Sequence, residues 1–418
     1  MRPYFTREQF RHPKFLAGLL LLAFLVQSVW LVKREVQAKG TSDSEVVRIA
    51  EGWQQWHGGR IAGAPYADFH ALPSAEVSDQ GYDTEQSPLL SLVTAAPLLV
   101  LPQNVQPQNV QPQNSEHDGE SNSGRWLPRL PFLACGFFLG ASLWYVARRL
   151  CGNAGGFIAL TFYCFSPSMI QAGAVWHTEP EIVAAWGAFG SVFTAIAVAH
   201  TLYAPREVVL WNWRRIVLLG VSLAIAVGAQ FSLVVVVPLA LGFLLYVAPV
   251  RRQAAIVIWV AACVVGFVIL FSFYFFHPHD FTESLRRASF WGATWRGFRV
   301  WGVYKQVAAQ VGRACPALIL ALPVAVATYA AWPRTRYFGN TAPLLVSAVF
   351  LVLGMAHPHM AGAGFLITAI PFLFIFVAGV LADLLETRYR TLVTACVLGM
   401  LGAYVAWDLL NLAQVPVG

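Results

Sequence analysis

The chain is poor in charged residues: Asp, Glu, Lys and Arg make up 12% of its 418 residues, whereas hydrophobic residues make up 57%. Soluble globular domains carry roughly 25% charged residues. This shortage excludes a soluble enzyme and a nucleic-acid-binding module, and it predicts an all-α polytopic membrane protein. The net charge of +7 is therefore interpreted by position along the chain, because basic residues fix the topology of membrane proteins.

Cysteine is also scarce. The chain has six cysteines, and no two of them form a Cys-x-x-Cys pair. Most of them lie within apolar runs, which is typical of small core residues. The sequence therefore indicates neither a disulfide framework nor a zinc site, and no metal ligands are predicted.

Long apolar runs are abundant. A spanning helix needs about 20 apolar residues, and the whole chain, 1–418, is predicted to form one membrane domain of about eleven spans. The first lies at 15–32; spans two to seven lie within 130–276 and spans eight to eleven within 315–410. The eleven ranges are 15–32, 130–147, 155–173, 181–199, 214–230, 232–249, 254–276, 315–332, 341–356, 364–384 and 391–410.

Arginine pairs indicate the orientation. With the N-terminus in the cytoplasm, short inner loops hold pairs such as Arg148–Arg149 and Arg251–Arg252. Two long loops, 33–129 and 277–314, then face the outer side. Loops this long are usually functional or disordered.

The first outer loop has three parts. Residues 41–59 predict an amphipathic helix in which Val46, Ile49, Ala50 and Trp53 share one face. The apolar run 88–101 contains two prolines and predicts a re-entrant or interfacial helix. A PQNVQ repeat within 102–124 predicts a disordered spacer.

Acidic residues stand at two predicted helix starts on the outer side. Asp43 and Glu45 begin the amphipathic helix, and Glu179 precedes the fourth span. Carboxylates stabilise helix N-termini, so capping alone is one interpretation. The other is a site assembled from both helix starts, because a carboxylate near hydrocarbon is rarely kept without a partner or a task.

The second outer loop is rich in cations, against the positive-inside pattern. Its basic residues alternate with tryptophans, which suits either a specific phosphate site or anchoring to lipid headgroups. Two histidines in the last short outer loop are candidates for contact with phosphate or acceptor. The candidate phosphate-binding residues are Arg286, Arg287, Arg296, Arg299, Lys305, His357 and His359.

The order of these segments resembles the GT-C superfamily of polyprenyl-phosphate-sugar-dependent glycosyltransferases. It is most similar to the branch with protein O-mannosyltransferases, lipid A aminoarabinose transferases and RgtA/B/C/D-like proteins. The matching segments are SDSEVVRIA (42–50), EQSPLLSLV (85–93), RLPFLACGFFLG (129–140), ARRLCG (147–152), FSP (165–167) and HTEPEIVAA (177–185).

The resemblance implies a GT-C-like fold and an inverting transfer of a sugar from a polyprenyl-phosphate donor to a glycan, lipid or protein acceptor. It implies an active site on the periplasmic face of a cell (inner) membrane. Glu45 is the expected acid–base carboxylate, with Asp43 as its competitor and Glu179 as a second carboxylate. No cofactor is firmly implied; a divalent cation shared by the carboxylates stays open.

Two departures from the family pattern keep other functions open. The acidic pair is split by Ser44, and Gln230 stands where relatives often carry a lysine. The alternatives are a transporter or flippase for a lipid-linked sugar and a non-catalytic protein that binds polyprenyl lipid. A transporter would place its ionisable residues near the midplane of the bilayer.

Overall fold

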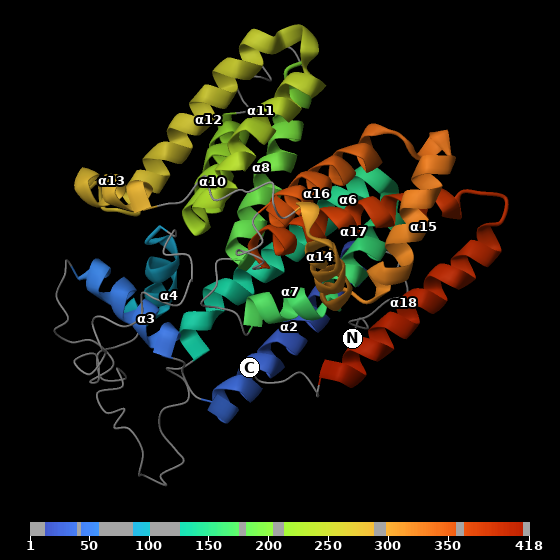
Figure 1. Cartoon of the computed structure of the whole chain (residues 1–418), viewed down its shortest axis with the longest axis horizontal. Helices are drawn as coiled ribbons and strands as arrows, with labels where there is room; N and C mark the ends of the chain where they lie inside the picture. Colours follow the sequence, from blue (N-terminus) through green and yellow to red (C-terminus); the bar gives the residue numbers. More distant parts are fainter. Residues whose placement is uncertain are drawn as a thin grey trace, which may run out of the picture.

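The computed structural model describes residues 13–39, 43–57, 87–100, 126–174, 181–203, 213–287, 298–356 and 363–412. Every regular element in these ranges is a helix, which confirms the predicted all-α class for the part of the chain that they cover (Figure 1). Within the described ranges, seven helices are long and apolar enough to cross a membrane, or eight if one bent pair, α14 and α15, counts as a single span. The chain is thus a multi-pass membrane protein.

The helices in the first half of the chain are α2 (Pro13–Lys39), α3 (Asp43–Trp56), α4 (Leu89–Leu99), α6 (Leu130–Cys164), α7 (Pro167–Ala174), α8 (Glu181–Thr201) and α10 (Trp213–Ala229). Those in the second half are α11 (Val236–Val247), α12 (Arg252–Ser272), α13 (Pro278–Arg287), α14 (Trp301–Ala314), α15 (Ala317–Ala331), α16 (Phe338–Ala356), α17 (Ala363–Leu385) and α18 (Arg390–Leu412). The short 3-10 helices η4 (Leu127–Arg129) and η5 (Phe231–Val235) lead into α6 and α11.

The count of eleven spans is not confirmed, although a helix lies at each predicted range. Three of these helices are short, since α10 has 17 residues, α11 has 12 and α15 has 15. A helix of 17 residues is about 26 Å long, less than the ~30 Å of the hydrocarbon layer. In addition, Leu127–Cys164 counts as one candidate span, although the sequence predicts a second span that begins within it.

Helix α6 is broken at Gly152, between the predicted second and third spans. Gly152 has φ 74° and ψ −176°, a region that residues with a side chain avoid. A methyl group built on Gly152 would meet no atom within 4 Å, so the backbone conformation and not space demands glycine here. The first arm of α6 therefore matches the second predicted span, 130–147, whereas the third predicted span, 155–173, covers the second arm and continues into α7.

Helix α17 forms the centre of the bundle. Its side chains Phe372, Phe374 and Phe376 are fully buried, and it packs against α6, α8, α15 and α16. Helices α12 and α18 lie at the periphery (Figure 1). Apolar residues on them are open to the surroundings, such as Val257 at 67% and Leu410 at 74% exposed, which suits contact with lipid tails.

Helices α3 and α4 belong to the first outer loop and pack closely on each other. A methyl group on Gly52 would lie 1.9 Å from the carbonyl oxygen of Ser91, so the two backbones touch at this point. The indole Nε1 of Trp56 donates to the carbonyl oxygen of Leu92 at 3.1 Å. Trp53 is buried on the face predicted for the amphipathic helix.

Two other predictions for this loop concern α4 and the PQNVQ repeat. With 11 residues, α4 is about 16 Å long and too short to span a membrane. Its placement as a re-entrant or interfacial helix stays a prediction. The PQNVQ repeat within 102–124 lies outside the described residues.

Candidate functional site

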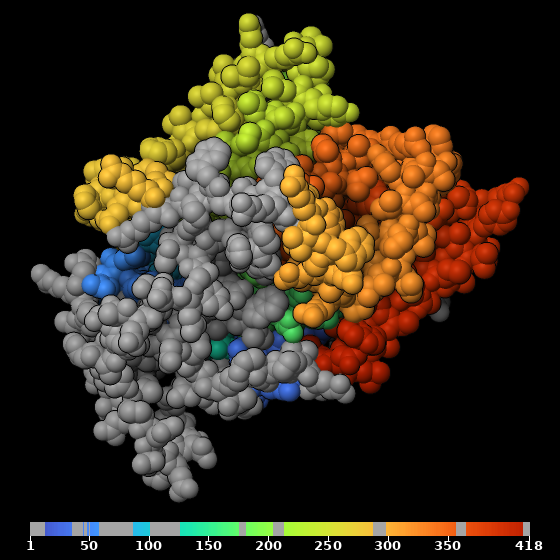
Figure 2. Space-filling model, in the orientation of Figure 1, coloured from blue at the N-terminus to red at the C-terminus, as the bar shows by residue number. Residues whose placement is uncertain are grey.

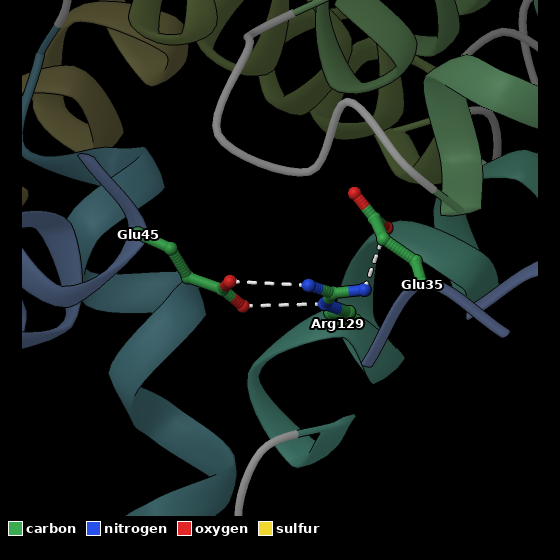
Figure 3. Close-up of polar contacts among 3 residues, drawn as sticks. All are labelled: Glu35, Glu45 and Arg129. Carbon is green, nitrogen blue, oxygen red and sulfur yellow. Dashed lines mark hydrogen bonds and ion pairs between the residues drawn. The ribbon is translucent and has the colours of Figure 1, made fainter. Parts of the chain in front are cut away.

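A buried ion triad joins three segments that are far apart in the sequence. The guanidinium of Arg129 donates from Nε to Oε1 of Glu45 at 3.2 Å and from Nη2 to Oε2 of Glu45 at 3.1 Å. Its third nitrogen, Nη1, donates to Oε2 of Glu35 at 2.7 Å. Figure 3 shows the two carboxylates approaching different edges of the guanidinium, Glu45 from α3 and Glu35 from the end of α2.

All three side chains of the triad are withdrawn from solvent. Their exposed fractions are 2% for Arg129, 0% for Glu45 and 12% for Glu35. Charges this deeply buried are tolerated only when they are paired and hydrogen-bonded, and the two-pronged Arg129–Glu45 contact meets both conditions. The triad carries one net negative charge, because two carboxylates face one guanidinium.

The local sequence explains where each member of the triad stands. Pro128 precedes Arg129 in η4, where its fixed φ suits the start of a helix. Arg129 then lies at the N-terminal end of α6, where the helix dipole disfavours a cation. The carboxylates of Glu35 and Glu45 offset this unfavourable position. Glu45 itself lies in the first turn of α3, where the dipole favours an acid.

The structure describes only some of the predicted site residues. Glu179, Arg296, His357 and His359 lie outside the described residues. Asp43 is the first residue of α3 and Arg287 the last of α13, but nothing is described of their side chains. The side chains of Arg286, Arg299 and Lys305 are described, and all three are exposed.

The described cations do not form one cluster. Arg286 is on α13, whereas Lys305 is on α14. The two helices lie apart in Figure 1, and both are at the surface of the face shown in Figure 2. The described cations of the second outer loop therefore belong to separate elements.

An aromatic cluster fixes α13 beside α3. Phe281 of α13 packs with Phe231, Leu270 and Tyr274, and burial raises the pKa of the Tyr274 phenol, which donates to Oγ of Ser284 at 2.9 Å. The next residue along the chain, Phe275, makes an edge contact with the Trp56 ring of α3, with ring centroids 5.9 Å apart. Phe275 and Phe276 both have positive φ, 50° and 60°, which is rare for bulky residues and produces the sharp turn into α13.

Helix α4 connects the triad to the break between α10 and η5. It contacts η4, which carries Arg129, and it contacts α10. At its start, the hydroxyl of Ser87 donates to the carbonyl oxygen of Gly228 at 2.5 Å, and the Ser87 amide donates to the same oxygen at 3.2 Å. Residues from the first outer loop are thus hydrogen-bonded directly to the membrane bundle.

Sequence reasoning did not assign a role to Arg129 or Glu35. In the sequence, Arg129 stood out only as the first residue of the segment RLPFLACGFFLG (129–140). Two signals could have identified it: an arginine at the outer end of a span opposes the positive-inside rule, and a cation at a helix N-terminus opposes the dipole. Glu35 follows Lys33 and Arg34 at the end of the first span, so its sequence neighbours give no hint of a distant partner.

The described donors do not fit a divalent cation. The described residues include no group of three or more His, Cys, Asp or Glu side chains that could hold a metal ion. Glu35 and Glu45 both contact the guanidinium of Arg129, so a cation already lies between these two carboxylates. All six cysteines are free thiols.

Comparisons with known proteins show the fold. No model of a known protein family matches the chain, and no curated protein matches it in sequence. The crystal structure of the oligosaccharyltransferase of Archaeoglobus fulgidus in complex with zinc and sulfate matches with a TM-score of 0.51 and 12% identity, over 93% of this chain and 53% of that one. The oligosaccharyltransferase AglB of the same archaeon, in complex with an inhibitory peptide and a dolichol-phosphate, matches with a TM-score of 0.49 and 14% identity, over 97% and 55%.

The chain spans about half the length of these archaeal proteins. The match with the zinc and sulfate complex covers 93% of the present chain, so it concerns the entire helical bundle and not one hairpin. The chain therefore shares the fold of about half of that oligosaccharyltransferase.

Proposed function

We propose that the chain is a membrane glycosyltransferase that moves a sugar from a polyprenyl-phosphate-linked donor to an acceptor of the cell envelope. The observation that carries this proposal is the similarity of almost the whole chain to an oligosaccharyltransferase fold. The sequence motifs add the nature of the donor, since they resemble enzymes that use lipid-phosphate sugars. They also favour the branch of mannosyltransferases and aminoarabinose transferases.

The proposed reaction needs a carboxylate that orients or deprotonates the acceptor. Both oxygens of Glu45 accept hydrogen bonds from Arg129, and hydrogen bonds to the charged form of a carboxylate weaken it as a base. Glu45 is also fully buried. We therefore assign Glu45 the role of holding α3 in place, and we assign proton transfer to Asp43, two residues earlier at the start of the same helix, with Glu179 as the second carboxylate.

The reaction also needs positive charge for the lipid-phosphate leaving group. Arg286, Arg299 and Lys305 are exposed and free to meet an anion from solvent or from the membrane surface. Because they lie on two separate helices, we propose that α13 and α14 contact the lipid phosphate and neighbouring headgroups at different points. Arg287, Arg296, His357 and His359 remain candidates for the same role.

The test compares envelope glycans by mass spectrometry among a deletion strain and strains complemented with wild type, Asp43→Asn or Glu45→Gln. The variants are matched for abundance in the membrane. The proposal expects one sugar modification to disappear in the deletion strain and to return with wild type. Asp43→Asn is expected to restore less than about one hundredth of it, the lower range for loss of a general base.

Glu45→Gln serves as the matched variant on the same helix. It keeps the side-chain shape and one hydrogen-bond acceptor for Arg129, so partial activity is expected. If the deletion changes no envelope glycan, the transferase proposal fails. If instead Asp43→Asn is fully active and Glu45→Gln is inactive, the transferase stands and Glu45 is the base.

A further inference from the structure

Gln230 occupies a break between two helices of the membrane bundle. It follows the last residue of α10 and adopts an extended conformation, with φ −150° and ψ 112°, before η5 begins. Its amide N–H still closes the last turn of α10 by donating to the carbonyl oxygen of Ala226 at 3.1 Å. This hydrogen bond fixes the backbone from which the side chain projects. Gln230 is buried, with 6% of its surface exposed.

Only half of the Gln230 side-chain amide is satisfied. Its Nε2 donates to Oγ of Ser232 at 2.7 Å. Its Oε1 is buried and has no hydrogen-bond partner among the residues that the structure describes. An unsatisfied buried polar group destabilises the protein, so a bound group that pairs with it gains affinity.

The chemistry of the missing partner follows from the amide. The oxygen and nitrogen of a glutamine side chain can be exchanged by a flip, and Ser232 can donate as well as accept. The unsatisfied end of the amide is then the oxygen, an acceptor, in one orientation and the NH2 group, a donor, in the other. A hydroxyl group can pair with either end. An ammonium group can pair only with the oxygen, and a phosphate only with the NH2 group.

The side chains that the structure describes in contact with Gly228 and Gln230 are uncharged. Ser87 lies against Gly228, two residues before Gln230, and Phe273 and Leu89 face the same glycine. A buried phosphate would need a cationic partner, which Gln230, Ser232 and Ser87 do not supply. Neutral hydrogen-bonding groups of this kind suit hydroxyls.

We propose that Gln230, together with Ser232, forms a subsite for a sugar hydroxyl of the lipid-linked donor. This subsite rests on the proposed transferase function. Its position supports it, because α4 contacts both α10, which ends at this break, and η4, which carries Arg129 of the triad. One short helix thus separates the hydroxyl subsite from the carboxylates of α3.

The experiment measures equilibrium binding of two kinds of lipid to the purified full-length protein in detergent, by thermophoresis. One is undecaprenyl phosphate without a sugar, and the other is a panel of undecaprenyl phosphates that carry glucose, mannose, galactosamine or aminoarabinose. Wild type is expected to bind at least one sugar-bearing lipid more tightly than the bare lipid. Gln230→Leu is expected to weaken that binding between about two- and tenfold, the value of one neutral hydrogen bond, and to leave the bare lipid within about twofold.

Gln27→Leu is the matched control. Gln27 is also a buried amide with an Oε1 that lacks a partner among the described residues, but it lies within α2 and donates to the carbonyl oxygen of Cys164 at 3.4 Å. It should not change the preference for sugar-bearing lipid. If Gln230→Leu does not fold, as judged by thermal unfolding, Gln230→Asn serves instead and should weaken the same lipid.

The outcomes separate the two proposals. If wild type binds neither kind of lipid, the transferase proposal fails and the subsite fails with it. If wild type binds lipid but Gln230→Leu weakens bare and sugar-bearing lipid equally, or weakens neither, the transferase proposal stands and the sugar subsite is wrong. The subsite is also wrong if no sugar increases the affinity over that of the bare lipid.

Discussion

At the scale of single residues, Arg129 decides whether two buried carboxylates are tolerated. Replacing Arg129 by methionine removes the guanidinium that both Glu35 and Glu45 contact. Breaking a buried ion pair from one side costs about 3–5 kcal/mol. We expect Arg129→Met to lower the free energy of unfolding by this amount, measured by thermal or denaturant unfolding in detergent.

Neutralising the partners gives the control for this prediction. Glu45→Gln keeps an acceptor for Arg129 and leaves the charge balanced by Glu35, so it should cost less than half as much. The triple variant Glu35→Gln, Glu45→Gln, Arg129→Met should regain part of the loss, because no buried charge is left unpaired. A triple variant less stable than Arg129→Met would show that the contacts matter through shape and not through charge.

The sequence predicted the place of Glu45 but not its partner. Acids at the start of an amphipathic helix follow from local pattern, and α3 begins at Asp43 as expected. The contact between Glu45 and Arg129 joins residues 84 positions apart. Local periodicity carries no information about such a pair, so the burial of Glu45 could not be derived from it.

At the scale of helices, the contact between α3 and α4 depends on Gly52. Any side chain there would overlap the carbonyl oxygen of Ser91. We expect Gly52→Ala to separate the two helices, with a loss of about 1–3 kcal/mol from overpacking. Hydrogen exchange of the amides of α3, followed by mass spectrometry, should become faster.

Gly399→Ala is the matched variant for this test. Gly399 lies within α18, and a methyl group on it would meet no atom within 4 Å. Alanine favours a helix over glycine by up to about 1 kcal/mol, so this change should be neutral or stabilising and should leave α3 unaffected. Unchanged exchange of α3 in Gly52→Ala would mean that the helices approach less closely than the structure shows.

The positions of the helices could be predicted from the sequence, but their lengths could not. Apolar runs identified a helix at every predicted span, because hydrocarbon requires the backbone to satisfy its own hydrogen bonds. The extended Gln230 and the break at Gly152 depend on how neighbouring helices pack. Composition cannot distinguish a full span from two short helices or from one broken helix, which is why the count of eleven was not confirmed.

At the scale of the whole molecule, the ends of two distant helices, α2 and α18, lie together. Nη1 of Arg34, near the end of α2, donates to the carbonyl oxygen of Leu412, the last residue of α18, at 3.3 Å. The exposed pair Arg334 and Glu386, 3.1 Å apart, includes a residue close in sequence to the other end of α18, which begins at Arg390. We expect that end to face the cytoplasm, because the arginine-rich loops then follow the positive-inside rule.

Cysteine labelling tests this orientation. In a variant with all six cysteines replaced by alanine, Gln54→Cys on α3 and Glu386→Cys offer two exposed positions. In sealed right-side-out membrane vesicles, a membrane-impermeant maleimide should label Gln54→Cys at once. It should label Glu386→Cys at least ten times more slowly until detergent is added. The reverse pattern would place α3 and the triad in the cytoplasm.

The ion triad also imposes an order on biosynthesis. A ribosome delivers the chain from its N-terminus, so Glu35 and Glu45 are made well before Arg129, which lies 94 and 84 residues further on. Until α6 enters the membrane with Arg129 at its head, Glu45 lacks the two-pronged contact that it makes in the folded protein. Formation of the triad thus reports that the second membrane helix has been inserted, and a nascent chain halted between α3 and α6 lacks it.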